Sequence, residues 1–268
     1  FSYRFYNNEK YRNIISLTFS STIFLLWGPS KLSYAGYFSL ADLMGISSFP
    51  QTFSLAMFFL TASYLFKLKY NKIDYILIIL LLLLMFLSHI TTGIIFIIFF
   101  YMFILFYYFN KKIYKKEFLI LLLIPLIVII LSFFWPYFSV SKTIFNIQKI
   151  HTGPIDIFSA NLFNVSNWFS IAGLGLLGFP FLFYKKNLFL LFWFILFFLI
   201  SISYLSPIRI SSFWRFFPIM LIPSMLALSY SIVNHKKFLR SFLIFVIIII
   251  GFFYFSEKIQ YHINWEPF

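Results

Sequence analysis

The chain has 268 residues, of which 62% are hydrophobic, 25% are aromatic and only 10% are charged, and its formal net charge at pH 7 is +14. A soluble domain has about 45–50% apolar and about 25% charged residues, so a water-soluble core of this size is too small for these apolar side chains. The composition therefore argues against a soluble domain. Because the chain has no cysteine, disulfides, thiolate metal sites and a cysteine nucleophile are excluded.

Nine apolar segments follow one another along the chain. They cover roughly residues 13–27, 50–66, 73–88, 92–109, 117–134, 168–184, 188–204, 214–232 and 241–255. A helix needs about 20 residues to cross the hydrocarbon core, and these segments lack the alternation of barrel strands. The sequence therefore predicts an all-α fold, a polytopic transmembrane helical bundle of about nine spans that forms one integral membrane domain over residues 1–268. Because the chain begins at Phe1 with no cleavable signal pattern before the first span, we expect it to be the C-terminal part of a larger protein.

Basic residues gather in alternate connections between these segments. The clusters are Arg4, Lys10 and Arg12; Lys67, Lys69 and Lys72; Lys111, Lys112, Lys115 and Lys116; Lys185 and Lys186; and Lys236, Lys237 and Arg240. The positive-inside rule assigns the side that carries them to the cytoplasm. We therefore expect an integral protein of the cell membrane with a cytoplasmic N-terminus and an outer C-terminus. The positive charge then reflects topology, and we expect no nucleic-acid binding.

The stretch SHITTG, Ser88 to Gly93, interrupts the apolar run from Tyr75 to Phe109. It lies between the basic stretches 67–72 and 110–116, which predicts an outer turn between two antiparallel helices. Two interpretations stay open. The turn is a polar hairpin tip, or His89 lies at the lip of an outward cavity, where it donates a hydrogen bond to an anion.

Other ionisable groups fall in the predicted outer connections. They are Asp42 in residues 28–51, His151 and Asp156 in residues 136–167, and Arg209 and Arg215 in residues 206–218. Guanidinium groups form bidentate hydrogen bonds with phosphate oxygens, although an arginine beside Trp214 also suits the membrane surface by snorkelling. The predicted outer face therefore offers groups that suit a lipid phosphate and a sugar.

Three stretches carry a resemblance to a known family. They are GISSFPQTFSLAMFFL (45–60), SHITTG (88–93) and WRFFPIMLIPSMLALSYSI (214–232). With them the chain resembles the C-fold (GT-C-like) polytopic membrane glycosyltransferases, and it is similar in particular to the group named after a 6-pyruvoyl-tetrahydropterin-synthase-related membrane domain. The resemblance covers about residues 28–110 and 205–235. It implies a membrane enzyme whose partners are membrane lipid and a sugar carried on polyprenyl phosphate, used on the outer face.

The implied reaction assigns a role to each candidate residue. An acceptor hydroxyl attacks the anomeric carbon as the lipid phosphate leaves, and a carboxylate takes the hydroxyl proton. Arginine, histidine or a divalent cation such as magnesium or manganese stabilises the charge on the phosphate. The role of the carboxylate that takes the proton is assigned to Asp42, with Asp156 as the second choice. Binding of the phosphate is assigned to His89, Arg209 and Arg215, with His151 as the second choice.

Two alternative functions stay open. One is a polysaccharide polymerase or ligase, which is also polytopic and uses outer arginine and histidine residues. The other is a transporter or a non-catalytic membrane subunit. An ion-coupled transporter places charges near the membrane midplane, and the centres of the nine segments are nearly free of them.

Overall fold

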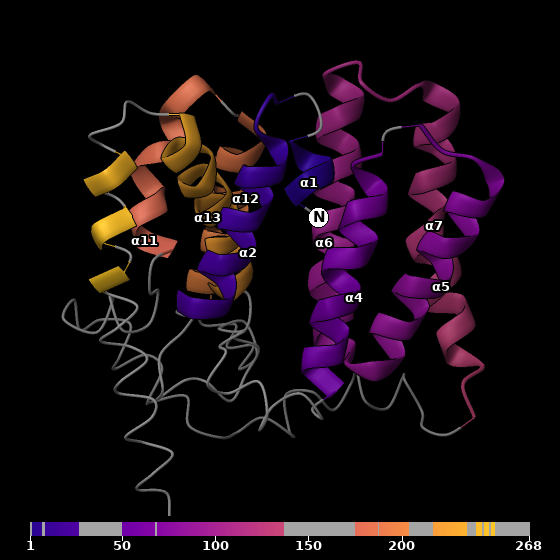
Figure 1. The fold of residues 1–268 in the computed structure, drawn as a ribbon. Helices are drawn as coiled ribbons and strands as arrows, with labels where there is room; N and C mark the ends of the chain where they lie inside the picture. The colour runs from indigo at the N-terminus through magenta and orange to yellow at the C-terminus, as the bar shows by residue number, and fades with distance from the viewer. Residues whose placement is uncertain are drawn as a thin grey trace, which may run out of the picture.

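The computed structural model describes residues 2–6, 9–26, 50–67, 69–136, 175–186, 188–203, 217–234, 240–242, 244–246 and 248–249. Within these ranges the regular secondary structure is entirely helical, and no strand occurs (Figure 1). The all-α prediction is confirmed for this part of the chain.

The helices follow the predicted apolar segments closely. In chain order they are α1 (Ser2–Phe5), α2 (Arg12–Leu26), α4 (Pro50–Leu65), α5 (Lys72–Ser88), α6 (Ile90–Phe109), α7 (Lys115–Phe133), α11 (Gly175–Gly178), the 3-10 helix η3 (Phe179–Lys186), α12 (Leu188–Ser203) and α13 (Phe217–Asn234). Of the helices that the structure describes, α6 with 20 residues and α7 with 19 are long and apolar enough to cross a membrane. Shorter apolar stretches lie in α4, α12 and α13.

The segment predicted at 168–184 differs from a single long helix. Its described part is one turn of α-helix, α11, which continues directly as the 3-10 helix η3. Pro180 lacks the N–H that an α-helical hydrogen bond requires, and Gly175 and Gly178 lower the helix propensity. This local chemistry explains why the apolar segment does not continue as one regular α-helix here.

The helices form two groups that lie side by side in Figure 1. One group contains α4, α5, α6 and α7, and the other contains α2, α11, η3, α12 and α13. In the second group α13 lies at the centre, because every residue from Ile219 to Ile232 is buried. Its buried hydroxyls bond back to the helix, Ser224 to the Leu221 carbonyl at 3.1 Å and Ser229 to the Met225 carbonyl at 2.7 Å.

A close backbone contact fastens α11 to α13. A Cβ atom at Gly178 would lie 1.9 Å from the carbonyl oxygen of Ser224. Only glycine allows this approach, because any side chain there would overlap the α13 backbone. The central helix is therefore enclosed from the α11 side by main-chain contact.

The two groups meet at Phe189, in the first turn of α12. Its side chain is buried, and its ring packs 5.3 Å from Phe106 and 5.3 Å from Tyr107 on α6. Its other ring neighbours are Phe103 at 6.0 Å, Phe66 at 6.0 Å, Phe5 at 6.2 Å and Trp193 at 6.0 Å. One phenylalanine therefore joins α1, the end of α4, α6 and α12.

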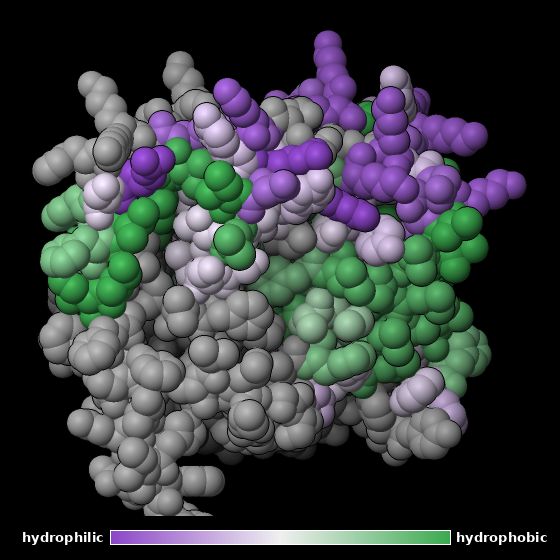
Figure 2. All heavy atoms as spheres, in the orientation of Figure 1, coloured by the Kyte–Doolittle hydropathy of each residue, from purple (hydrophilic) through white to green (hydrophobic). Residues whose placement is uncertain are grey.

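The opposite ends of the α4–α7 group differ in chemistry. The connections α4–α5 and α6–α7 carry Lys67, Lys69, Lys72, Lys111, Lys112, Lys115 and Lys116, and we call this the basic end. His89 joins α5 to α6 at the other end, which we call the tip end. Figure 2 shows the hydrophilic surface gathered along one edge and a hydrophobic surface below it. The predicted separation of SHITTG from the stretch 110–116 is therefore present as opposite ends of α6.

A polar network closes the basic end between α4 and α5. The ammonium group of Lys67 donates to both carboxylate oxygens of Asp74, at 2.8 and 2.9 Å. Asp74 also accepts from the Asn71 backbone N–H, while its own N–H donates to the Asn71 side chain, which forms a capping box. Arg4 donates to the carbonyl of Ser63 near the end of α4. A cation at a helix C-terminus and a carboxylate at a helix N-terminus both suit the helix dipoles.

We predict that Phe189→Ala weakens the packing between the two helix groups and destabilises the protein. Removing the ring opens a cavity among at least six aromatic neighbours, which should lower the free energy of unfolding by about 3 kcal/mol. Phe192→Ala is the matched control, because that ring lies on the same helix and is 46% exposed. Thermal unfolding in detergent measures both variants. Equal losses of stability would contradict the special role of Phe189.

Candidate functional site

The tip end is built on the shortest possible helix connection. His89 alone separates α5 from α6, with φ −154° and ψ 97°, and it serves as the C-cap of one helix and the N-cap of the next. Its N–H donates to the Met85 carbonyl at 3.0 Å, and its carbonyl accepts from the Gly93 N–H at 3.0 Å. The backbone groups of His89 are therefore used by both helices.

The imidazole ring of His89 also takes part in capping. Its Nδ1 atom accepts from the Thr92 N–H at 3.3 Å and lies 2.8 Å from the Thr92 hydroxyl oxygen. An acceptor Nδ1 requires the neutral tautomer with the proton on Nε2. The hairpin interpretation of His89 therefore has a direct structural basis, and Nε2 is the ring atom through which the residue would donate to an anion.

The glycine at the end of SHITTG, Gly93, lies where α5 and α6 approach each other closely. A Cβ atom there would lie 2.6 Å from Cδ2 and 2.8 Å from Cα of Phe86. The second distance involves main chain, so rotation of the Phe86 side chain would not relieve the overlap. α5 and α6 approach each other this closely because residue 93 has no side chain.

Three further polar side chains near the tip are buried in the protein. Thr91 and Thr92 are buried, and so is Ser54 of α4. The Ser54 hydroxyl donates to the Met85 carbonyl at 3.1 Å, the same oxygen that accepts from the His89 N–H. The Met85 carbonyl therefore joins α4, α5 and the start of α6 in one polar junction inside the bundle.

The other candidate residues fall outside the described ranges. Asp42 belongs to residues 27–49, His151 and Asp156 to residues 137–174, and Arg209 and Arg215 to residues 204–216. Their distances from His89 and from one another remain predictions. No group of three His, Cys, Asp or Glu side chains that would suit a metal ion occurs among the residues that the structure describes.

Four of the helix ends that border these segments lie at the tip end, beside His89. α4 begins beside His89, because Ser54 bonds Met85, and α7 runs from the basic end at Lys115 to the tip end at Phe133. The first turn of α12 packs on Tyr107 at the basic end, so α12 runs toward the tip end as well. Tyr230, near the end of α13, stacks on Tyr6 at 5.5 Å beside the basic end, which places the start of α13 at the tip end.

Tyrosine hydroxyls at the basic end are held as donors. Burial, with a contribution from the negative charge of Glu117, raises the pKa of Tyr70 well above its usual value. Burial, followed by contacts with Tyr230 and Glu9, raises the pKa of Tyr6 in the same way. Each hydroxyl stays protonated and donates to a backbone carbonyl, Tyr70 to Leu65 and Tyr6 to Leu226. These groups have a structural role in tying chain segments together.

Sequence reasoning assigned Lys67 to topology and did not identify its partner Asp74. The signal was present as Asn71 and Asp74 at the spacing of a capping box, directly before an apolar run. The burial of Asp74 could not be read from this pattern, because it depends on Lys67 folding back from the end of α4.

Comparisons of this chain with family models, with curated proteins and with solved structures find no match.

We predict that Gly93→Ala destabilises the α5–α6 hairpin. The added methyl group overlaps the main chain of Phe86, so the helices must move apart at a cost of about 1–3 kcal/mol. Ser88→Ala is the control in the same hairpin, since it removes only a hydroxyl that bonds back to the Leu84 carbonyl. Thermal unfolding measures both. A Gly93→Ala variant as stable as the Ser88→Ala variant would refute the close approach of the two helices.

Proposed function

We propose that the chain is a polytopic membrane protein of about nine spans that transfers a sugar from a polyprenyl-phosphate carrier at the tip end of the bundle. The proposal has two parts, the membrane placement and the reaction. Different observations support each part, and separate experiments test them.

The surface of α5 supports the membrane placement. Ile73, Ile76, Leu80 and Leu84 follow one another at helical spacing and are each 48–65% exposed. In a water-soluble protein the outward face of such a helix is polar. An apolar stripe along the whole outer face of a helix suits contact with lipid chains.

α7 presents a second apolar face to the outside. Leu119, Leu123, Leu126, Ile130 and Phe133 are each 48–57% exposed along its length. On α4 to α7 and their described connections, charged side chains occur only at the basic end. α12 and α13 contain no charged residue. Apolar outer surfaces with charges at one end suit a bundle that stands across a bilayer.

We predict opposite membrane sides for the two ends of α7. The natural chain has no cysteine, so single cysteines report position without background labelling. Phe134→Cys at the tip end and Lys116→Cys at the basic end both replace exposed residues. A membrane-impermeant maleimide should label Phe134→Cys in intact cells, and Lys116→Cys only after permeabilisation. Labelling of both from the same side would refute the transmembrane placement of α7.

One observation carries the proposed reaction. Four helix ends lie at the same end of the bundle as His89. They are the start of α4 after Asp42, the end of α7 before His151 and Asp156, and the end of α12 and the start of α13 on either side of Arg209 and Arg215. A transferase that uses a lipid-linked sugar needs a carboxylate and phosphate-binding cations together at one membrane face. The resemblance of residues 45–60, 88–93 and 214–232 to C-fold glycosyltransferases points to the same end.

The proposed roles follow the charge changes of the reaction. Asp42, or Asp156 in its place, takes the proton of the acceptor hydroxyl. Arg209 and Arg215 bind the phosphate that leaves the sugar, and His89 donates to it through Nε2 while Nδ1 holds the hairpin cap. Of the alternatives, a polymerase or ligase would use the same end, whereas a transporter would need charges near the centres of the spans.

The reaction is tested with variants that separate structure from chemistry. Asparagine is a good N-cap residue, so His89→Asn should keep the free energy of unfolding within about 0.5 kcal/mol. Loss of the Nε2 donor should lower turnover of a polyprenyl-phosphate sugar by about tenfold to a thousandfold, since removing one charge-stabilising donor costs up to about 2.7–4 kcal/mol in such sites. Arg215→Ala should lower turnover in the same way.

Lys31→Ala is the control for Arg215→Ala, since both remove a cation from a predicted outer connection and only Arg215 is assigned to the phosphate. The assay uses the complete protein in lipid vesicles and follows transfer of a radiolabelled sugar. Similar mild effects for Arg215→Ala and Lys31→Ala would mean that Arg215 only snorkels at the membrane surface. Full activity of His89→Asn would leave His89 as a hairpin cap alone.

A further inference from the structure

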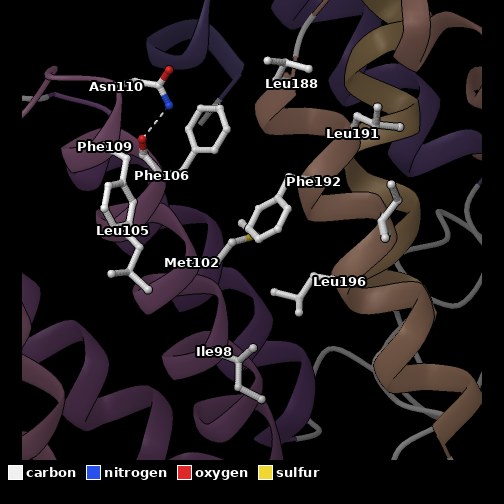
Figure 3. Close-up of a pocket in the computed structure, with 11 residues that line it drawn as sticks. Ile98, Met102, Leu105, Phe106, Phe109, Asn110, Leu188, Leu191, Phe192 and Leu196 are labelled. Atoms are coloured by element: carbon white, nitrogen blue, oxygen red, sulfur yellow. Dashed lines mark hydrogen bonds between the residues drawn. The ribbon is translucent and has the colours of Figure 1, made fainter.

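A groove runs between the two helix groups, along α6 and α12 (Figure 3). Its volume is about 640 Å³, within the range of about 300–1,000 Å³ that small-molecule sites occupy. Ile98, Met102 and Leu105 line it from α6, and Leu188, Leu191 and Ile195 line it from α12. Its walls are therefore apolar along most of its length.

The groove has the depth of one membrane leaflet. On α6 it extends from Ile98 to Asn110, and at 1.5 Å rise per residue this is about 18 Å. Half of a hydrocarbon core of about 30 Å is about 15 Å. The groove therefore reaches from the basic end to about the middle of the bundle.

The groove is long and apolar. It follows α6 for about 18 Å, and its lining is hydrophobic apart from Asn110 at one end. An extended hydrocarbon chain matches both its length and its lining.

Cations stand at the mouth of the groove. Asn110 lines its upper end and donates to the Phe106 carbonyl at 2.7 Å, and Lys111 and Lys112 follow directly as exposed side chains. The Lys112 ammonium lies 5.1 Å from the centre of the Tyr107 ring, and that ring packs on Phe189 of α12. Lys112 therefore lies where α6 meets α12 at the basic end, two residues after the lining residue Asn110, at the level where a lipid headgroup would lie.

No carboxylate lies on either wall to neutralise these lysines. α6 and α12 contain no Asp or Glu. Three acids are described on the neighbouring elements. Glu117 accepts from the Tyr114 N–H on α7, Asp74 is paired with Lys67, and Glu9 accepts from the Tyr230 hydroxyl at 3.5 Å. The mouth of the groove therefore carries net positive charge, which suits a phosphate group.

From this combination we propose that the groove is a binding site for an anionic phospholipid. One acyl chain lies between α6 and α12, and the phosphate contacts Lys111 and Lys112 at the basic end. The inference rests on the membrane placement proposed above and is independent of the transferase reaction, which is assigned to the opposite end. A lipid there would fill the gap that the two helix groups leave beside Phe189.

The first test fills the groove with a larger side chain. Ile195→Trp adds an indole inside it, and Leu199→Trp, one turn further along α12 on a similarly exposed position outside the groove, is the matched control. Native mass spectrometry of the detergent-solubilised full chain measures retention of phosphatidylglycerol. Ile195→Trp should weaken retention about tenfold, and Leu199→Trp should leave it unchanged. Equal retention by the two variants would overturn the site.

The second test addresses the charge. Phosphatidylglycerol should bind more tightly than phosphatidylcholine with the same acyl chains. The pair Lys111→Gln and Lys112→Gln should reduce that preference by about fivefold for each lysine. The pair Lys115→Gln and Lys116→Gln on α7 is the control and should keep the preference. Equal binding of the two lipids to the natural chain would overturn the anionic headgroup.

A third measurement uses the natural chain and does not depend on the folding of the tryptophan variant. Phosphatidylglycerol with a photoreactive group in its acyl chain is crosslinked to the natural chain, and the modified peptides are mapped. Crosslinks concentrated in residues 98–110 and 188–196 support the site. Crosslinks spread evenly over the exposed face of α7 would overturn the site. The site would also be overturned if Ile195→Trp abolished self-association without changing lipid retention, because a second copy of the chain would then occupy the groove. Recovery of the chain in the soluble cell fraction would instead refute the membrane placement.

Discussion

The packing of aromatic rings around Phe189 is the contact on which the arrangement of the two helix groups depends. α4 to α7 form one group and α2 with α11 to α13 form the other. α6 and α12 touch through rings, Phe189 against Phe106 and Tyr107 near the basic end and Trp193 against Phe99 one turn further along. Large flat side chains contribute much contact area with few rotatable bonds, so a single buried ring fixes several helices. Beside these contacts an apolar groove runs along α6 and α12, from Asn110 and Leu188 to Ile98 and Leu196.

The polar sequence at the tip end of this apolar chain has structural roles that are compatible with a chemical role. His89 uses its backbone and Nδ1 to cap two helices, and Gly93 brings α5 and α6 together. These roles account for the histidine, the threonine and the glycine of SHITTG without a substrate. The capping arrangement also fixes the orientation of the imidazole ring, which is what a phosphate-binding histidine requires.

The two ends of the bundle have different chemistry. The basic end carries exposed lysines, the buried pair of Lys67 and Asp74, and tyrosines that bond to backbone carbonyls. The tip end has one described connection, the capping residue His89, and it borders each segment that holds another proposed catalytic or phosphate-binding residue. A phospholipid site at one end and a transferase site at the other would divide structural and catalytic roles between the two membrane faces.

The sequence by itself determined the helical class, the bounds of α2, α4, α5, α6, α7, α12 and α13 to within a few residues, and the separation of His89 from the lysines of residues 110–116. These depend on local properties, namely apolar run length, basic clusters and turn residues, which act along the chain. Only the tertiary structure decided that Ser54 bonds Met85, that Asp74 is buried against Lys67, that Phe189 joins the two groups and that a groove lies between α6 and α12. In a chain where nearly every helix is apolar on all sides, hydrophobicity does not distinguish inward from outward faces, so the fit of side-chain shapes selects which helices meet.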